Sequence, residues 1–250
     1  MKRAKKVKYN QSMRYLMVLS LSVLLLGCSS IDVERVRALD KVAVPMITVN
    51  KYIDMGKFSL GKVVQRIVED DKFDLQPALD NLHNKTYNNF ATNLPFSLID
   101  EKKLLSYDKY KNFEMFTNID RESRYLLTPE GYMKYSPTFF TGALNKRSKI
   151  LEAIPEEADA AMTVYVDYQF VKRNIPMIPV KMAAIKARVR MDIYNKKNER
   201  VLKIRENAES DEEIKAIAGV MTDTDKIRSM TLNATNKALE EADNFIQENL

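Results

Sequence analysis

The sequence holds one cysteine, one histidine and no tryptophan. A single cysteine cannot form an intrachain disulfide, and one histidine cannot build a histidine-rich metal site. Neither a Gly-x-Gly-x-x-Gly nor a Gly-x-x-x-x-Gly-Lys motif occurs, which excludes the usual phosphate-binding loops. The histidine, His83, has no nearby signature of a Ser-His-Asp arrangement, and we interpret it as a surface residue of a helix. We therefore expect no metal and no dissociable cofactor.

The remaining candidates for chemistry are acidic side chains, which gather in three places. These clusters are Glu69-Asp70-Asp71, Glu156-Glu157-Asp159 and Asp211-Glu212-Glu213. None has the alternating ligand spacing of a calcium loop, and Asp223-Thr224-Asp225, which comes closer to it, is typical of a helix N-terminus. Two carboxylates could serve glycoside hydrolysis, but the sequence cannot pair them in space. We expect no enzyme and keep a carboxylate-dependent periplasmic hydrolase as an alternative.

The first 27 residues have the layout of an export signal. They carry six basic residues and no acidic one; the basic residues are Lys2, Arg3, Lys5, Lys6, Lys8 and Arg14. An almost wholly apolar run from Tyr15 to Leu26 follows, as in secretory signals. This run is shorter than the roughly 20 residues that a transmembrane helix needs, so the sequence predicts a removable segment.

The end of the apolar run, Leu25-Leu26-Gly27-Cys28, resembles the lipobox of bacterial lipoproteins. The resemblance implies cleavage between Gly27 and Cys28, a diacylglycerol group on the Cys28 sulfur and an acyl chain on its new amino terminus. Several buried chains anchor a protein stably, whereas one chain does not. Ser29 and Ser30 resemble the pattern sorted to the outer membrane, on its periplasmic or surface face. An uncleaved signal anchor, or an ordinary signal peptide with a chance cysteine, remains open.

Removing the signal changes the electrostatic character of the chain. The full chain has 40 basic and 34 acidic residues, so the loss of six basic residues leaves 34 of each and a net charge of zero. A basic field that would attract nucleic acid is therefore absent. The expected organisation is a signal peptide over 1–27, a short tether over 28–40 and a single domain over 41–250.

Hydrophobic periodicity predicts an α+β fold with a mixed or antiparallel sheet of about 4–5 strands, packed with helices and ending in a long C-terminal helix. Strands are expected over 41–49, 96–100, 158–171, 182–194 and 201–204, with Pro45 marking an edge or a bulge. Helices are expected over 58–68, 75–90, 101–113 and 142–154. The last helix should begin at a cap at Thr224 or Asp225.

Two segments of this pattern resemble certain small envelope lipoproteins. Glu157-Ala158-Asp159-Ala160-Ala161-Met162-Thr163-Val164 is similar to a strand entry of the curli-secretion-channel family and of the lipoprotein activators of penicillin-binding proteins. Val189-Arg190-Met191-Asp192-Ile193-Tyr194, followed by Glu199-Arg200-Val201-Leu202, is similar to their next two strands. The chain has Val164 or Val166 where those families have glycine. The resemblance implies a fold and assigns no functional residue.

Two surfaces are candidates for binding. One is aromatic and consists of Tyr125, Tyr132, Tyr135, Phe139 and Phe140, residue types enriched at interfaces; the alternative is that they form a lid over the core. The other is the stripe Lys186, Arg188 and Arg190, which either contacts an acidic partner or anionic headgroups or is simply a solvated strand face.

From these features we expect a membrane-anchored envelope lipoprotein that is a non-catalytic binding or assembly module. Its partners would be the membrane, through the lipid, and an envelope protein or a peptidoglycan-associated protein, with homo-oligomers left open. Besides the hydrolase, a ring-forming secretion-related lipoprotein is the second alternative.

Overall fold

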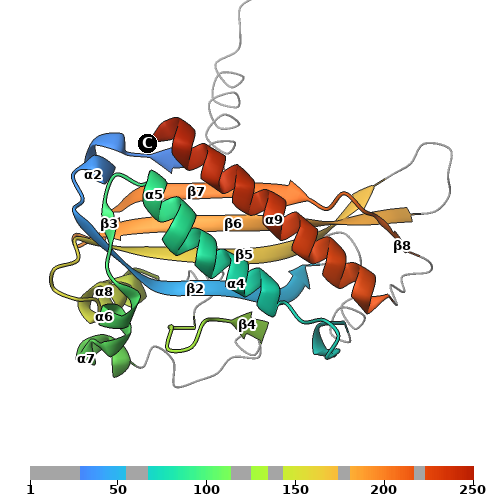
Figure 1. The fold of residues 1–250 in the computed structure, drawn as a ribbon, viewed down its shortest axis with the longest axis horizontal. Coiled ribbons are helices and arrows are strands. Elements are labelled where there is room, and N and C mark those ends of the chain that lie inside the picture. Colours follow the sequence, from blue (N-terminus) through green and yellow to red (C-terminus); the bar gives the residue numbers. More distant parts are fainter. Residues whose placement is uncertain (1–28, 55–66, 114–124, 135–142, 174–180, 217–222) are drawn as a thin grey trace, which may run out of the picture.

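One sheet of eight strands organises the molecule (Figure 1). The structure is a computed structural model that describes residues 29–54, 67–113, 125–134, 143–173, 181–216 and 223–250. The strands are β1 (Ser30–Ile31), β2 (Lys41–Asp54), β3 (Ser97–Leu98), β4 (Leu126–Leu127), β5 (Ala160–Arg173), β6 (Lys181–Asn195), β7 (Arg200–Glu209) and β8 (Ile214–Ala216). The predicted α+β class is confirmed. The strand number exceeds the predicted 4–5 because the sheet also contains β1, β4 and β8, which have only two or three residues each.

The strand order is β1-β7-β6-β5-β2-β3, with β4 paired to β2 and β8 to β6. Strands β5, β6 and β7 form an antiparallel meander, whereas β2 runs parallel to β5. A tight turn joins β6 to β7, in which Asn198 adopts a left-handed backbone with φ of 62°. Asparagine tolerates this conformation better than most residues. The sheet is therefore mixed, as predicted.

Pro45 lies at a bulge in β2. Between Ala43 and Met46 the chain of β2 advances by three residues while β5 advances by two, from Ala161 to Thr163. The extra residue changes which side of the sheet the following side chains face. The bulge prediction is thereby confirmed.

The helices are α2 (Val33–Arg37), α4 (Gln76–Asn84), the π-helix η1 (Lys85–Phe90), α5 (Ala91–Asn93), α6 (Glu101–Ser106), α7 (Asp108–Lys111), α8 (Ala143–Ala153) and α9 (Thr224–Asn249). The predicted helix over 75–90 is α4 continued by η1, and the one over 101–113 breaks at Tyr107, whose backbone is extended. The N-cap of α9 is Asp223, one residue before the predicted cap, and its carboxylate accepts a 2.9 Å hydrogen bond from the backbone N–H of Lys226. Most of the helix predicted over 58–68 lies outside the described residues.

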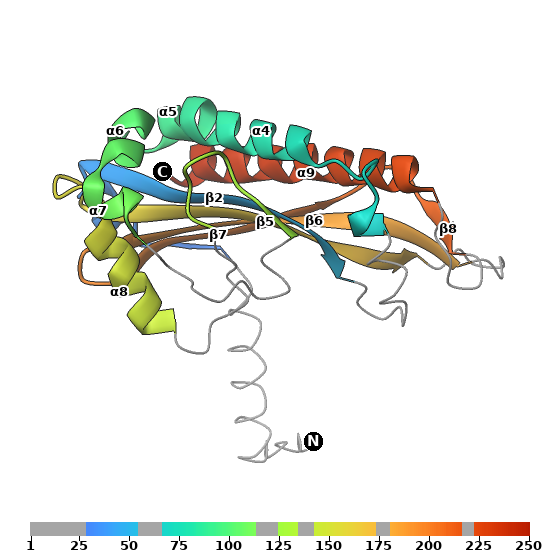
Figure 2. The ribbon, with the colours of Figure 1, turned by 90° about the horizontal axis from the view of Figure 1, so that it is seen from below.

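Helices α4 and α9 lie side by side across one face of the sheet (Figure 2). The face of α9 that points to the sheet is built from residues at steps of three and four, as predicted. These buried residues include Ile227, Met230, Ala234, Ala238, Ala242 and Ile246. Small alanines let the helix approach the strands closely, and the main hydrophobic core lies in this layer.

A second, smaller core lies at one end of the molecule. It joins α6, α7 and α8 to the beginnings of β2 and β5, and includes Met46, Leu104, Tyr110, Ile150 and Ile154. Figure 2 shows α8 on the side of the sheet opposite to α4 and α9. Among the described residues no other helix covers that side of β5, β6 and β7, so we call it the open face. Several of its side chains are nevertheless buried, since Tyr165, Tyr194 and Lys203 are only 5%, 6% and 8% exposed.

Residues 29–37 are part of the fold, whereas the sequence predicted a tether over 28–40. Strand β1 pairs antiparallel with β7, and the backbone N–H of Asp32 donates to the carbonyl of Val201 at 3.0 Å. Val36 of α2 is fully buried. The pairing covers the outer edge of β7, which would otherwise present unpaired backbone groups. The described fold therefore already includes residues 29–37, which precede the predicted domain start at residue 41.

Candidate functional site

The residue after Cys28 is fixed to the sheet. Cys28 and Gly27 lie outside the described residues, and Ser29 is the first residue described. The Ser29 hydroxyl donates a 2.8 Å hydrogen bond to Oε1 of Glu206 and accepts one of 2.8 Å from the backbone N–H of Arg205. The chain therefore enters the fold at the edge of β7 with no slack after residue 28.

The predicted aromatic surface divides into a buried part and an exposed part. Tyr135, Phe139 and Phe140 lie outside the described residues. Tyr132 is only 7% exposed, so it is a core residue and not part of a binding surface. Its segment folds back onto η1, which the sequence pattern could not indicate.

Tyr125 is partly exposed, and its ring centroid lies 6.0 Å from that of Tyr52. Tyr52, near the end of β2, is 40% exposed and is the exposed large hydrophobic residue of the described chain. The hydroxyl of Tyr125 donates to Glu69 at 3.2 Å. We call Tyr52, Tyr125 and Glu69 the tyrosine patch. Tyr52 was not among the predicted site residues because it lies beyond the strand predicted over 41–49.

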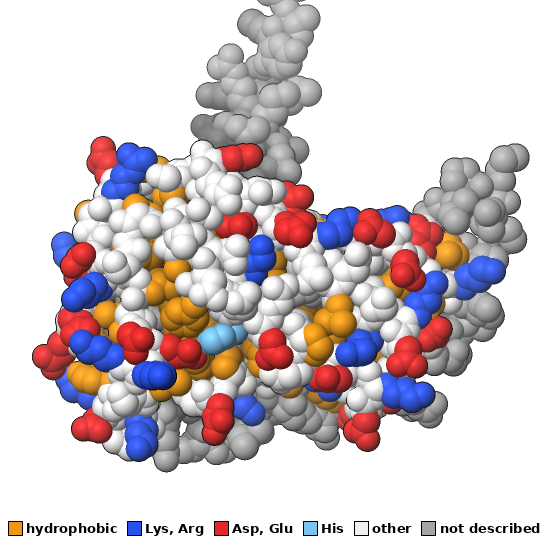
Figure 3. Space-filling view, in the orientation of Figure 1, with side chains coloured by type: hydrophobic (Ala, Val, Ile, Leu, Met, Phe, Trp, Pro, Cys, Tyr) orange, Lys and Arg blue, Asp and Glu red, His pale blue; other side chains and the backbone are white. Residues whose placement is uncertain are grey.

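His83 lies on α4 and is partly exposed, in keeping with the interpretation as a helix surface residue, but its side chain also belongs to a cluster. Its Nε2 lies 2.8 Å from Oε1 of Glu101, and both side chains are about one-third exposed. The imidazole also packs on the rings of Tyr87 and Tyr132, at centroid distances of 5.2 and 6.1 Å. Figure 3 shows the histidine on the helix side of the molecule, among hydrophobic side chains. The cluster ties α4 and η1 to α6.

The two tyrosines of this cluster form a 2.8 Å hydrogen bond between their hydroxyl groups. Burial raises the pKa of Tyr87 to about 12. Burial also raises the pKa of Tyr132, and the neighbouring Tyr87 and Glu101 add to the effect. Both phenols are therefore neutral donors and acceptors at physiological pH, a structural arrangement.

Basic side chains gather on the open face. Cross-strand partners point to the same side of a sheet, and the register pairs Arg188 with Asp167, Arg190 with Arg205 and Asp192 with Lys203. We define the basic face as Lys186, Arg188, Arg190, Arg200, Lys203 and Arg205, of which Lys203 is buried, at 8% exposed. The predicted stripe on β6 thus widens into a patch over β6 and β7. Three acids lie within it: the buried Asp167 and Asp192, and Glu209, which is the cross-strand partner of Lys186.

Asp167 and Asp192 each lie close to two arginines. The Asp167 side chain is 6% exposed and contacts Nε of Arg188 and, at 2.7 Å, Nη2 of Arg190. The Asp192 side chain is 7% exposed and lies 2.6 Å from Nη2 of Arg205 and 3.7 Å from Nη1 of Arg200. Charge-assisted bonds of this kind hold a guanidinium in one orientation. The basic face is therefore an ordered array with more positive than negative groups.

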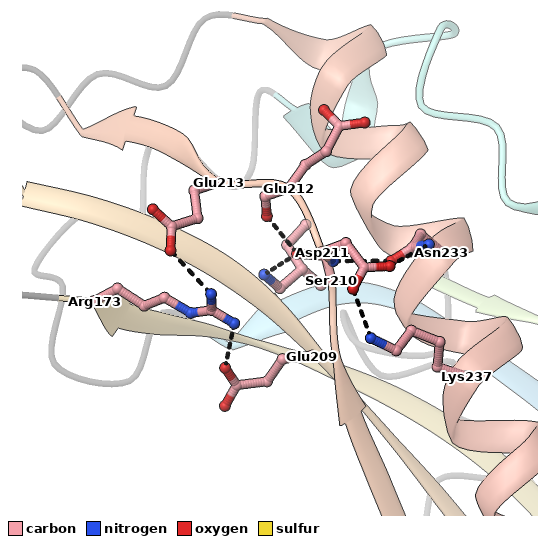
Figure 4. A network of polar contacts seen from close by, with 9 residues as sticks. Arg173, Glu209, Ser210, Asp211, Glu212, Glu213, Asn233 and Lys237 are labelled. Carbon is pink, nitrogen blue, oxygen red and sulfur yellow. Dashed lines mark hydrogen bonds and ion pairs between the residues drawn. The ribbon is translucent and has the colours of Figure 1, made fainter.

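The acidic clusters found in the sequence are taken up by structural contacts. Glu156 pairs with Lys109 at 3.1 Å, and Glu157 with Lys103 at 2.6 Å. Figure 4 shows the third cluster, in which Asp211 contacts Lys237 at 2.8 Å and Glu213 contacts Arg173 at 2.9 Å. In the part of the chain that the structure describes, no group of three or more His, Cys, Asp or Glu side chains is arranged to hold a metal ion.

The strand entry that resembles envelope lipoproteins has a structural acid. One carboxylate oxygen of Asp159 accepts the backbone N–H groups of Asp40 and Lys41, at 3.0 and 3.1 Å. The bond from Lys41 is the main reason that the pKa of Asp159 is lowered, and the bond from Asp40 adds to it. This carboxylate joins the beginnings of β2 and β5.

Comparison with known proteins gives little further information. No protein-family model matches the chain, and no curated protein matches it. Among solved structures it is similar to the hypothetical protein CT253 from Chlamydia trachomatis, with a TM-score of 0.26 and 10% identity over 84% of this chain and 99% of that one. A likeness at this level carries no argument about function. No helix among the described residues is long and apolar enough to cross a membrane.

Proposed function

We propose that the protein is a bacterial envelope lipoprotein, anchored through lipid on Cys28, which acts as a non-catalytic binding or assembly module. The lipobox-like stretch Leu25–Cys28 motivates the anchor. The observation that carries the proposal further is the pair of hydrogen bonds that hold Ser29 on β7. Because the fold begins one residue after Cys28, an anchored domain lies directly against its membrane.

The absence of slack separates this arrangement from a tethered domain. A free tether over 28–40 would reach roughly 40 Å when fully stretched. With residues 29–37 packed on the sheet, that reach falls to the length of about one residue. A module held in this way meets partners at the membrane surface.

The tyrosine patch is the surface that we assign to an envelope partner. Tyrosine offers apolar area and a polar hydroxyl together, which suits recognition. Tyr52 is exposed at the end of β2, away from the β1–β7 edge where the chain is anchored. The partner that we propose for this patch is an outer-membrane protein or a peptidoglycan-associated protein, because an anchored domain meets its partners at the membrane.

The hydrolase alternative gains no support from the buried acids of the open face. Asp167 lies opposite Arg188, four residues along β6 from Asp192, which separates the two acids by about 13 Å. Catalytic carboxylates of glycosidases lie roughly 5–9.5 Å apart. No observation favours the ring-forming alternative over a monomeric module.

The test combines anchoring and contact. A photo-crosslinking amino acid replaces Tyr52 in the full chain, and a matched chain carries it at the exposed Glu240 of α9. After irradiation of native membranes, we expect a discrete crosslinked product from position 52 only, and its loss in the Cys28→Ala background. Persistence in that background would mean that the domain finds its partner without the anchor. Absence of any product at position 52 would contradict the assigned surface.

A further inference from the structure

The basic face carries a net positive charge, and the rest of the domain carries the compensating negative charge. The chain after residue 27 has equal numbers of basic and acidic residues, so a basic excess on one side requires an acidic excess elsewhere. Part of it lies on the helix side, in and before α4. There the acids are Glu69, Asp70, Asp71, Asp74 and Asp80, against the single base Lys72. The charges of the domain are thus distributed unevenly, with a basic excess on the open face and an acidic excess in and before α4.

The anchor enters the fold next to this face. The Ser29 hydroxyl accepts a hydrogen bond from the backbone N–H of Arg205, and Ser30 is the cross-strand partner of Lys203. Arg205 and Lys203 both belong to the basic face. Neighbouring strands are about 4.8 Å apart, so β7 and β6 lie within about 10 Å of β1. A lipid chain attached at Cys28 holds this part of the sheet close to the bilayer.

We propose that the basic face docks on an anionic lipid surface, so that the anchored domain lies with its sheet against the bilayer and its helices outward. This inference rests on the proposed anchor at Cys28. Positive charges near an anionic bilayer are each attracted measurably, and the attraction falls off within a Debye length. Orientation therefore depends on lipid charge and on salt.

The arginines of the face are ordered for phosphate contact. Asp167 holds Arg188 and Arg190, and Asp192 holds Arg205 and lies 3.7 Å from Arg200. The Arg188 and Arg200 side chains nevertheless remain 33% and 42% exposed. A guanidinium has five N–H donors, so one that contacts a carboxylate through one or two of them keeps others for a phosphate oxygen. An acidic protein would also be attracted, but the nearby anchor gives a lipid headgroup the higher local concentration.

The orientation can be read from a single spin label. If Cys28 is lipidated, a cysteine introduced elsewhere is the only free thiol of the chain. Asn207, exposed on β7 opposite Arg188, carries the label in one protein (Asn207→Cys), and the exposed Glu240 of α9 carries it in the control (Glu240→Cys). The lipidated protein, complete from Cys28 onward, is reconstituted in vesicles of phosphatidylcholine alone or with 30% phosphatidylglycerol. The accessibility of the spin label to a water-soluble paramagnetic relaxant is then measured.

We expect the label at position 207 to be shielded in the anionic vesicles and accessible in the neutral ones, and the label at position 240 to be accessible in both. Lys186→Gln with Arg200→Gln leaves Asp167 both of its arginines, Arg188 and Arg190, and leaves Asp192 its close contact with Arg205. In anionic vesicles this double variant should lower the ratio of shielded to accessible label about 25-fold, at about fivefold per basic residue. One molar salt should abolish the shielding.

Three results would overturn the inference. Accessibility of position 207 in both kinds of vesicle would mean that the face does not touch lipid. Shielding in both kinds would mean that contact does not depend on charge. Shielding in neutral vesicles only after addition of polyglutamate would assign the face to an acidic protein. A mass measurement that finds two labels per chain would show that Cys28 is free, so the anchor would have failed and not the docking.

Discussion

The Ser29 hydroxyl donates a 2.8 Å hydrogen bond to the carboxylate of Glu206, a residue 177 positions later in the chain. The same hydroxyl accepts the backbone N–H of Arg205. One small side chain thus satisfies two groups at the edge of β7. The contact fixes the place where the chain leaves the fold toward Cys28.

Ser29→Ala should lower the free energy of unfolding by about 1 kcal/mol, because both hydrogen bonds are partly exposed. Amide hydrogen exchange over 30–37 should also become faster, since β1 loses its first attachment. Ser30→Ala is the matched control, because Ser30 is exposed and should change neither quantity. Denaturant unfolding and exchange of the detergent-solubilised full chain measure both. Equal effects of the two substitutions would contradict the role of Ser29.

Asp159→Asn should remove part of the acid sensitivity of the fold. The pKa of Asp159 is lowered in the folded state by backbone hydrogen bonds. The unfolded chain therefore binds the proton more readily, and the stabilisation present above about pH 4 is lost as the pH falls through the folded pKa. The variant should cost about 1 kcal/mol at pH 7 and show a shallower loss below pH 4. An acid limb identical to that of the wild type would contradict this account.

Replacing Arg188 and Arg190 should destabilise the protein more than replacing both arginines together with Asp167. Arg188→Met with Arg190→Met leaves a buried carboxylate without compensation, at a cost of about 3–5 kcal/mol. Adding Asp167→Leu to the pair should restore most of that loss, because hydrophobic replacements of buried ion pairs are often neutral. Urea unfolding of the three chains measures the difference. A triple variant less stable than the double variant would refute the pairing.

The buried Tyr87, which is hydrogen-bonded to Tyr132, should make the fold less stable at alkaline pH. Burial raises the pKa of Tyr87 to about 12 in the folded state, whereas the unfolded phenol ionises near 10. Stability should hold below pH 10 and decline between about 10 and 12 as the unfolded state releases its protons first. Tyr87→Phe should cost about 1 kcal/mol at pH 7 and flatten this decline. A decline unchanged by the substitution would point to other groups.

The long strands and the last helix could be predicted from the sequence because their periodicity is strong. Alternation over 182–194 located β6, and steps of three and four after Thr224 located α9. Strand β3 falls within the strand predicted over 96–100, but β1, β4 and β8 were not predicted, since two or three residues carry no period. They are strands only because a longer neighbour supplies their hydrogen bonds.

The candidate sites were predicted less completely than the fold. The stripe on β6 was visible, but its partners on β7 and the buried Asp167 depend on register. The pairing of His83 with Glu101, and the burial of Tyr132, depend on how helices and loops fold back, and no local pattern encodes either contact. Tyr52 was missed because exposure is a property of the packed molecule.

The central claim is that lipid on Cys28 holds the domain at a membrane, and mass spectrometry of the N-terminal peptide from membrane-purified protein tests it most directly. The account predicts a chain that begins at Cys28 and carries a diacylglycerol group on sulfur and an acyl chain on nitrogen. Recovery of residues 1–27, or of an unmodified Cys28 thiol, would contradict it.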